Sequence, residues 1–228
     1  RVGEGDTDMR ALEIEIGEGA RFDLVTFAGG DGVATAHRKV SVAGAGEFRQ
    51  FVLTPGAKYS RVETEVDLVG ENARVRIDGV CLAEAGKHAD QTSSVALHAE
   101  GGEVRQLVRS VARRKGRGVF QGKFLVERPA QKTDAQMEHN ALLLEDGAEI
   151  FAKPELEIYA DDVQCAHGNT CGQLDEQAIF YARQRGLPEA DARAMLTRAF
   201  LVEAIPDWLD EDLRAEIETR IDAWLGAS

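Results

Sequence analysis

Four short stretches share one pattern: Gly19-Ala20-Arg21-Phe22, Gly56-Ala57-Lys58-Tyr59, Asn72-Ala73-Arg74-Val75 and Gly147-Ala148-Glu149-Ile150. In each stretch a residue that tolerates a positive φ angle comes first, because Gly and Asn adopt that conformation at little cost. A small Ala, suited to a crowded inner corner, follows, and a large apolar residue then starts an inward-facing strand. A recurring turn-and-strand unit is typical of a solenoid, in which each coil buries its apolar face against its neighbours.

The segments around these turns alternate apolar and polar residues, as in residues 12–16, 62–68 and 75–77. Such alternation predicts strands with one buried face. The turns are irregularly spaced, which favours a loose parallel β-helix over a strict hexapeptide helix. A jelly roll or β-sandwich is the structural alternative. We therefore expect a mainly β fold with a β-helix core over residues 1–172.

Two later segments depart from this pattern. Residues 103–115 fit either a short helix or an irregular strand with a basic edge, since their apolar residues fall at helical spacing. Residues 173–228 predict a small C-terminal helical domain. Asp175 is the expected N-cap of the first helix and Gly186 its C-terminal glycine, and Pro206 is expected to start the third helix.

Charge is unevenly distributed along the 228 residues, whose formal net charge is −13. Residues 1–133 contain 20 basic and 19 acidic groups, whereas residues 134–228 contain 7 and 21. The acidic excess therefore belongs to the C-terminal part, where it predicts either a well-solvated surface or a partner-binding one. An acidic chain is a poor generic nucleic-acid binder, and the short apolar runs predict no membrane helix. The chain begins with Arg1 rather than Met, so we expect an N-terminal portion to be missing.

Three cysteines without a secretion signal predict a reduced, cytoplasmic protein without a disulfide framework. The segment Cys165-Ala166-His167-Gly168-Asn169-Thr170-Cys171 places two thiols and an imidazole within seven residues. These groups suit iron, zinc or an iron–sulfur cluster. Alternatively, the cysteines are buried as small apolar residues and the histidine caps the following helix.

Two weaker His–carboxylate pairs are His88 with Asp90 and Glu138 with His139. Phosphate-binding loops, nucleophile elbows and zinc-protease motifs are absent from the sequence. ATP hydrolysis and serine-hydrolase chemistry therefore have no support in the sequence.

A resemblance to a known family rests on an ordered series of motifs, which are GRGVFQGK at 116–123, AQKTDA at 130–135, KPELEIYADDV at 153–163, CAHG at 165–168 and GQLDE at 172–176. The series resembles the SufB/SufD family of iron–sulfur cluster assembly scaffold proteins, from His88 to about Ile205. SufB-like chains generally carry Glu on both sides of the histidine found here as His167, whereas this chain has Ala166 and Gly168. His139 falls where SufB-like chains have the cysteine implicated in cluster assembly. The chain is thus more similar to SufD than to SufB.

The resemblance implies a right-handed parallel β-helix followed by a C-terminal helical domain. It also implies a non-enzymatic subunit that pairs with SufB through the β-helix and binds the ABC-type ATPase SufC through the helices. The residues expected to contact SufC are Phe180, Phe200, Trp208, Leu213 and Trp224. Without SufB, the chain is expected to be capable of forming a homodimer.

The resemblance further implies that His167 and Cys165 help to hold iron or a nascent cluster at the interface with SufB. His139, Cys171 and His88 are weaker candidates. The cluster would be transient, with no group bound tightly to the isolated chain. Two other functions fit the sequence, namely a stand-alone β-helix metal-binding module and a β-helix carbohydrate-active enzyme or acyltransferase.

Overall fold

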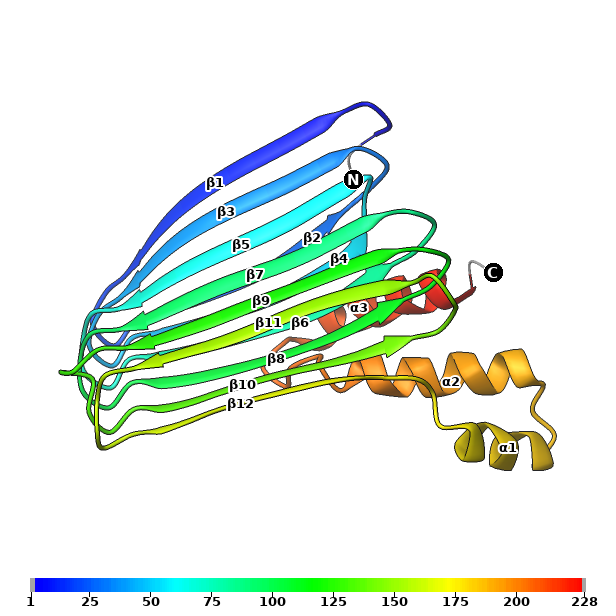
Figure 1. The fold of residues 1–228 in the computed structure, drawn as a ribbon. Helices are drawn as coiled ribbons and strands as arrows, with labels where there is room; N and C mark the ends of the chain where they lie inside the picture. The colour runs from blue at the N-terminus through cyan, green and yellow to red at the C-terminus, as the bar shows by residue number, and fades with distance from the viewer. Residues whose placement is uncertain (1–2, 227–228) are drawn as a thin grey trace.

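The computed structural model describes residues 3–226 and consists of a parallel β-helix followed by three helices (Figure 1). The chain alternates between two six-stranded sheets. The odd-strand sheet has the order β1 (Thr7–Ile16), β3 (Val33–Val42), β5 (Tyr59–Leu68), β7 (His88–Leu97), β9 (Arg117–Val126) and β11 (Glu149–Ile158). The even-strand sheet has the order β12 (Gln164–Gly172), β10 (Asp134–Leu143), β8 (Glu103–Ala112), β6 (Arg74–Ala83), β4 (Glu47–Gly56) and β2 (Arg21–Gly29).

The coils differ in length although the strands within each sheet pair in parallel. Thr7 pairs with Val33, 26 residues later in the chain, whereas Arg117 pairs with Glu149, 32 residues later. The extra residues lie in the turns, since nearly all strands have ten residues. This variation explains why the sequence shows recurring turns without a fixed period.

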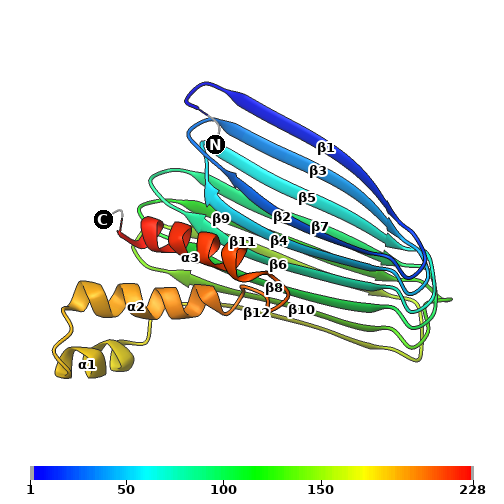
Figure 2. The same cartoon turned by 180° about the vertical axis from the view of Figure 1, so that it is seen from behind.

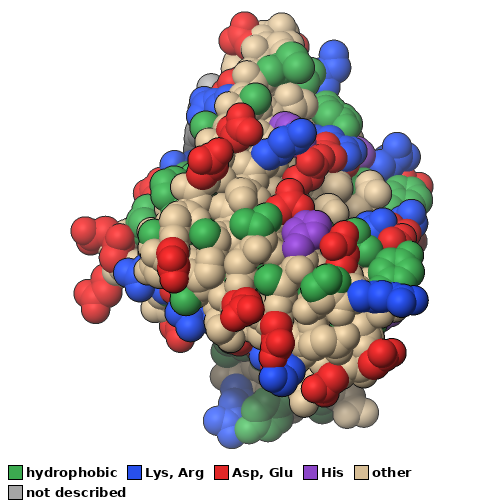
Figure 3. Space-filling model, turned by 90° about the vertical axis from the view of Figure 1, so that its left-hand side faces the viewer, with side chains coloured by type: hydrophobic (Ala, Val, Ile, Leu, Met, Phe, Trp, Pro, Cys, Tyr) green, Lys and Arg blue, Asp and Glu red, His purple; other side chains and the backbone are tan. Residues whose placement is uncertain are grey.

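The repeated turns adopt the predicted backbone conformation. Gly19, Gly56, Asn72 and Gly147, each directly before the Ala of its motif, have φ angles of 65°, 71°, 57° and 78°. The predicted crowded corner is found at Ala57 and Ala73, which are fully buried. At Ala20 the prediction is wrong, because this residue is exposed in the first coil. Figure 3 views the side of the solenoid along which odd-numbered strands turn into even-numbered ones, and apolar side chains are scattered there among acidic and basic ones.

Two apolar cores result from the alternation of side chains along the strands. The first lies between the sheets and contains, among others, Phe48, Val75, Val104, Phe120 and Phe124. The second lies on the outer face of the even-strand sheet, where the helices cover side chains such as Phe51, Leu82 and Val111 (Figure 2). The helical region therefore shares a core with the solenoid.

Residues 103–112 form the regular strand β8, so the helical alternative for this segment is wrong. Val104 and Val108 point into the solenoid, whereas Leu107 and Val111 lie on the outer face beneath the helices. Apolar residues are thus needed on both faces of the strand, and their combined spacing imitates that of a helix.

The three helices are α1 (Glu176–Gln184), α2 (Glu189–Val202) and α3 (Glu211–Gly226). Asp175 caps α1 as predicted, with its side chain accepting a hydrogen bond from the Gln177 amide at 2.8 Å. Gly186 follows α1 with a φ angle of 90°. The prediction that Pro206 starts the third helix is wrong, because the Asp210 side chain accepts from the Leu213 amide and α3 begins after it. Within residues 3–226, none of the helices has the length and apolar character needed to cross a membrane.

Candidate functional site

The C-terminal end of the solenoid is open. Within residues 3–226, β12 pairs only with β10 and β11 pairs only with β9, so each of these last strands has one unpaired edge in this part of the chain. Three large apolar side chains of β11 and the turn after it are at least 40% exposed, namely Phe151, Ile158 and Tyr159. An unpaired parallel strand presents backbone donors and acceptors to any chain that aligns with it. This end therefore combines free strand edges with apolar side chains.

The predicted metal-binding segment forms the last strand at this open end. In β12, Cys165 pairs with the buried Ala135 of β10 and His167 pairs with the buried Met137. Residues paired in register share a face of the sheet, so Cys165 and His167 lie on the inner face of the final coil. No further coil covers them in the described chain, and His167 is exposed while Cys165 is half-buried. His167 is two residues beyond Cys165 along the strand, so their Cα atoms are roughly 7 Å apart.

Cys165 packs against the main core, and burial raises the pKa of its thiol above the usual value. The thiol is therefore protonated at neutral pH until a metal ion or a partner displaces the proton. Cys171 lies six residues further along the same face of β12 and is exposed. Of the three candidate ligands on β12, Cys165 and His167 are the two that lie closest together along the strand.

His139 lies inside the solenoid and is fully buried. One ring nitrogen, Nδ1, is 2.8 Å from the Asn169 side-chain oxygen, and Nε2 is 2.9 Å from the Ser110 hydroxyl. The ring also stacks on Phe120 at 4.4 Å between centroids. Burial lowers the pKa of His139, so the ring is neutral, with Nδ1 donating to Asn169 and Nε2 accepting from Ser110. Both ring nitrogens of His139 are therefore hydrogen-bonded within the protein. Of the two partners, Ser110 is buried and Asn169 of β12 is exposed.

The other histidine candidates lie apart from β12. His88 begins β7 in the odd-strand sheet and stacks on Tyr59 at 4.9 Å between centroids. Its expected partner Asp90 instead pairs with Arg61, at 3.1 Å. Glu138 and His139 are adjacent in β10 and point to opposite faces, so they do not form a His–carboxylate pair.

The outer face of the even-strand sheet carries an open groove of about 750 Å³ that the sequence did not reveal. Its walls include Arg76, Asp78, Arg105, Glu138 and Thr170. These residues come from β6, β8, β10 and β12, and only the register of the coils brings them together. Asp78 is 2% exposed, and burial raises its pKa to about 6 although Arg76 lies 2.7 Å away.

Of the five helical residues expected to contact a partner ATPase, Phe180 is 62% exposed. The other four pack on the solenoid as part of the second core. Two arginines of the even-strand sheet and one directly after β8 lie over their aromatic rings, in the pairs Arg109–Phe200, Arg49–Trp208 and Arg113–Trp224. Leu213 is half-buried in the same core. The large exposed apolar side chains of α1 and α2 are instead Phe180, Tyr181 and Met195.

Known proteins and a protein-family model are similar to this chain over most of its length. The sequence model described as "SUF system FeS cluster assembly, SufBD core domain" matches residues 3–200. The iron–sulfur cluster assembly protein SufD of Escherichia coli is 39% identical over 73% of this chain and 39% of its own length. A SufBD family protein of Synechocystis is 33% identical over 85% of this chain and 43% of its own length.

A SufBD family protein of Pyrococcus horikoshii is 29% identical over 71% of this chain and 36% of its own length. The chain thus spans about two fifths of the length of these curated relatives. Because the family model covers nearly all of the β-helix and the first two helices, the chain belongs to the SufBD core family of SUF-system iron–sulfur cluster assembly proteins.

Proposed function

We propose that this chain is a SufD-like scaffold subunit that handles iron or a nascent iron–sulfur cluster as cargo at the open end of its β-helix. The observation that carries the proposal is the placement of His167 and Cys165 on the inner face of an unpaired final strand. The family membership and the 39% identity to a SufD protein support the same role.

A SufB-type paralogue is the proposed partner at this end. Its own edge strand would pair with β11 or β12, whose outer edges lack a neighbour within the described chain. Such pairing would satisfy backbone groups and bury Phe151, Ile158 and Tyr159, all largely exposed here. Without the paralogue, the same edges would allow two copies of this chain to pair.

Two ligands from this chain leave a metal site incomplete. Iron and iron–sulfur clusters generally take four ligands per iron, so the remaining ligands would come from sulfide and from the partner. A neutral imidazole binds iron, and the Cys165 thiol must lose a proton to do so, because burial holds its pKa above the usual value. Both features favour transient retention of cargo over a resident cofactor.

The helical region is the proposed docking surface for a SufC-type ATPase. Phe180, Tyr181 and Met195 are between 47% and 62% exposed on α1 and α2. Acidic residues predominate in the same part of the chain. Because α2 and α3 share a core with the even-strand sheet, movement of a bound ATPase would be transmitted to the strands that lead to β12.

The proposal predicts that His167→Ala lowers the cluster yield of the assembled complex at least about tenfold, the scale typical of a lost ligand or ligand support. Cluster yield is measured as visible absorbance and acid-labile sulfide after co-expression with SufB-like and SufC-like partners. Because His167 is exposed and Gly168 follows it, the substitution should leave the fold intact.

Thr170→Ala is the matched control, since Thr170 lies on the same strand but on its opposite face. This variant should keep the parental cluster yield. Equal yields from the parent and His167→Ala, with all three subunits co-purifying, would contradict the proposed role of the imidazole.

A further inference from the structure

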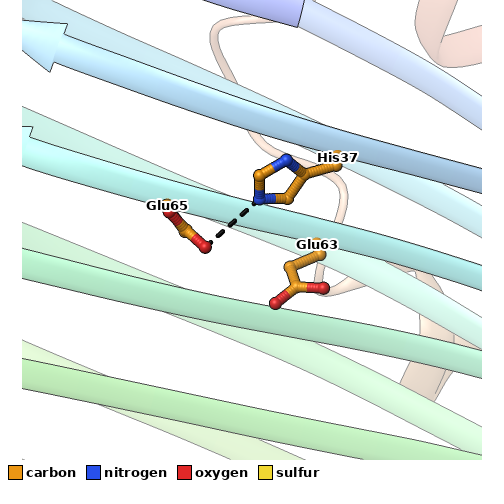
Figure 4. Close-up of side chains that lie close together, drawn as sticks. All are labelled: His37, Glu63 and Glu65. Carbon is orange, nitrogen blue, oxygen red and sulfur yellow. Dashed lines mark hydrogen bonds and ion pairs between the residues drawn. The ribbon is translucent and has the colours of Figure 1, made fainter. Parts of the chain in front are cut away.

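Three potential metal ligands gather on the outer face of the odd-strand sheet, remote in the fold from β12. His37 lies on β3, and Glu63 and Glu65 lie on the neighbouring β5 (Figure 4). His37 is paired in register with Glu63, and Glu65 is two residues further along the same face. One ligand atom from each residue lies within 4.8 Å of the other two. The His37 Nε2 atom is 3.2 Å from Glu65 Oε1.

The backbone beneath this trio is held on both sides. β3 pairs with β1 and β5, and β5 pairs with β3 and β7, so both strands lie inside the sheet. A site built on interior strands requires little rearrangement of the main chain when a ligand binds. The side chains of His37, Glu63 and Glu65 are 41%, 34% and 44% exposed, so an ion can reach them from solution.

The charges around the trio favour a cation. Within the described residues, Glu65 has no lysine or arginine nitrogen within 4.0 Å, and its ion-pair partner is His37. Lys39 is paired in register with Glu65, but among residues 3–226 no ion pair joins these two side chains. Glu63 contacts Arg61 at 3.2 Å, but the guanidinium is shared with Asp90 at 3.1 Å. Two carboxylates, Glu63 and Asp90, therefore share one guanidinium, and Glu65 has none in the described part of the chain.

We propose that His37, Glu63 and Glu65 bind one divalent first-row transition-metal ion, with Zn²⁺ as the reference ion. One imidazole and two carboxylates form a mixed nitrogen and oxygen ligand set that suits Zn²⁺ and its neighbours better than Ca²⁺ or Mg²⁺. Three protein ligands on an open face leave coordination positions for water or for a group from another molecule. The site does not depend on the function proposed for β12.

A second histidine of this chain lies between two carboxylates but has a different geometry. His98 places Nε2 2.9 Å from Asp67 and Nδ1 3.1 Å from Glu127. The two carboxylates contact opposite nitrogens of the ring and do not converge on one point. Hydrogen bonds to both raise the pKa of His98, which favours the imidazolium form that cannot bind a metal ion. His98 is therefore a matched control.

The test is titration of the whole chain with Zn²⁺ by calorimetry and with Co²⁺ by visible absorption. Cys165→Ser, His167→Ala and Cys171→Ser are present in every variant, so that β12 does not contribute soft ligands. We expect one site in this background, with an affinity at least about tenfold lower in His37→Ala and in Glu65→Gln. The His98→Ala variant should retain the parental affinity.

A histidine-specific NMR shift on adding Zn²⁺ should also be confined to His37. Absence of a saturable site in the background protein would overturn the proposal. So would an affinity unchanged by His37→Ala, or an equal loss in His98→Ala, with circular dichroism confirming that each variant is folded.

Discussion

We expect Trp224→Ala to lower the free energy of unfolding of the helical region by about 3–5 kcal/mol, the usual cost of removing a buried large aromatic side chain. Trp224 of α3 is 5% exposed and belongs to the core shared by the helices and the even-strand sheet. Arg113 lies over its ring at 4.0 Å and donates a hydrogen bond to its backbone carbonyl. The hydrogen bond from Arg113 to the backbone carbonyl of residue 224 can persist in the variant, but it would not compensate for the lost packing of the ring.

The effect should be local, because stability in a solenoid is largely a sum of contacts between neighbours. Hydrogen exchange of α3 amides and limited proteolysis near residue 210 are the appropriate measurements. Phe180→Ala is the matched control, since Phe180 is an aromatic residue of the same region that is 62% exposed. It should change stability by less than about 0.5 kcal/mol. Unchanged protection of α3 in Trp224→Ala would show that the helix is not held by this side chain.

The second large effect is expected for Asp78→Asn, and it depends on pH. Burial raises the pKa of Asp78 from 3.8 to about 6 in the folded chain. Between these values the folded chain holds a proton that the unfolded chain has lost. Asp78 therefore lowers the free energy of unfolding as pH rises from about 4 to above 6, by up to about 3 kcal/mol. Asparagine at this position carries no such penalty.

Asp78→Asn should accordingly be more stable than the parent by about 2–3 kcal/mol at pH 8, because the raised pKa already includes the favourable ion pair with Arg76. Below pH 4 the two proteins should differ little. Asp207→Asn is the matched control, because Asp207 pairs with the same Arg76 at 3.4 Å but is 88% exposed. Urea unfolding at several pH values measures both variants. A difference between Asp78→Asn and the parent that does not vary with pH would contradict the assigned pKa.

Much of the fold could be predicted from local sequence because turn chemistry is local. A residue that tolerates a positive φ angle, followed by Ala, recurs at Gly19, Gly56, Asn72 and Gly147, and each of the four has a positive φ angle in the structure. The same holds for the Asp175 cap of α1. The strand at 103–112 was ambiguous because its two faces meet different cores, a property of packing that is not encoded in local spacing.

The candidate site was predicted only as a set of residue types. Cys165 and His167 could be chosen from their chemistry and from the resemblance to a family, but their position on an unpaired final strand is a result of topology. The helical aromatic residues show the opposite outcome. Trp224 was expected at a partner surface, and the structure places it against the solenoid, because a terminal helix with one apolar face buries it on the nearest available sheet.

The solenoid turns, the helical C-terminal region, the membership of an iron–sulfur assembly family and the soft ligands at 165–171 can all be predicted from the order of the residues. Which of these residues meet depends on the fold. The coils differ in length by several residues, so counting along the chain does not show that His37 aligns with Glu63, that His139 aligns with Asn169, or that Asp78 and Glu138 line one groove. Those alignments are set by hydrogen-bonded register between coils, a long-range pairing that exists only once the sheets have formed.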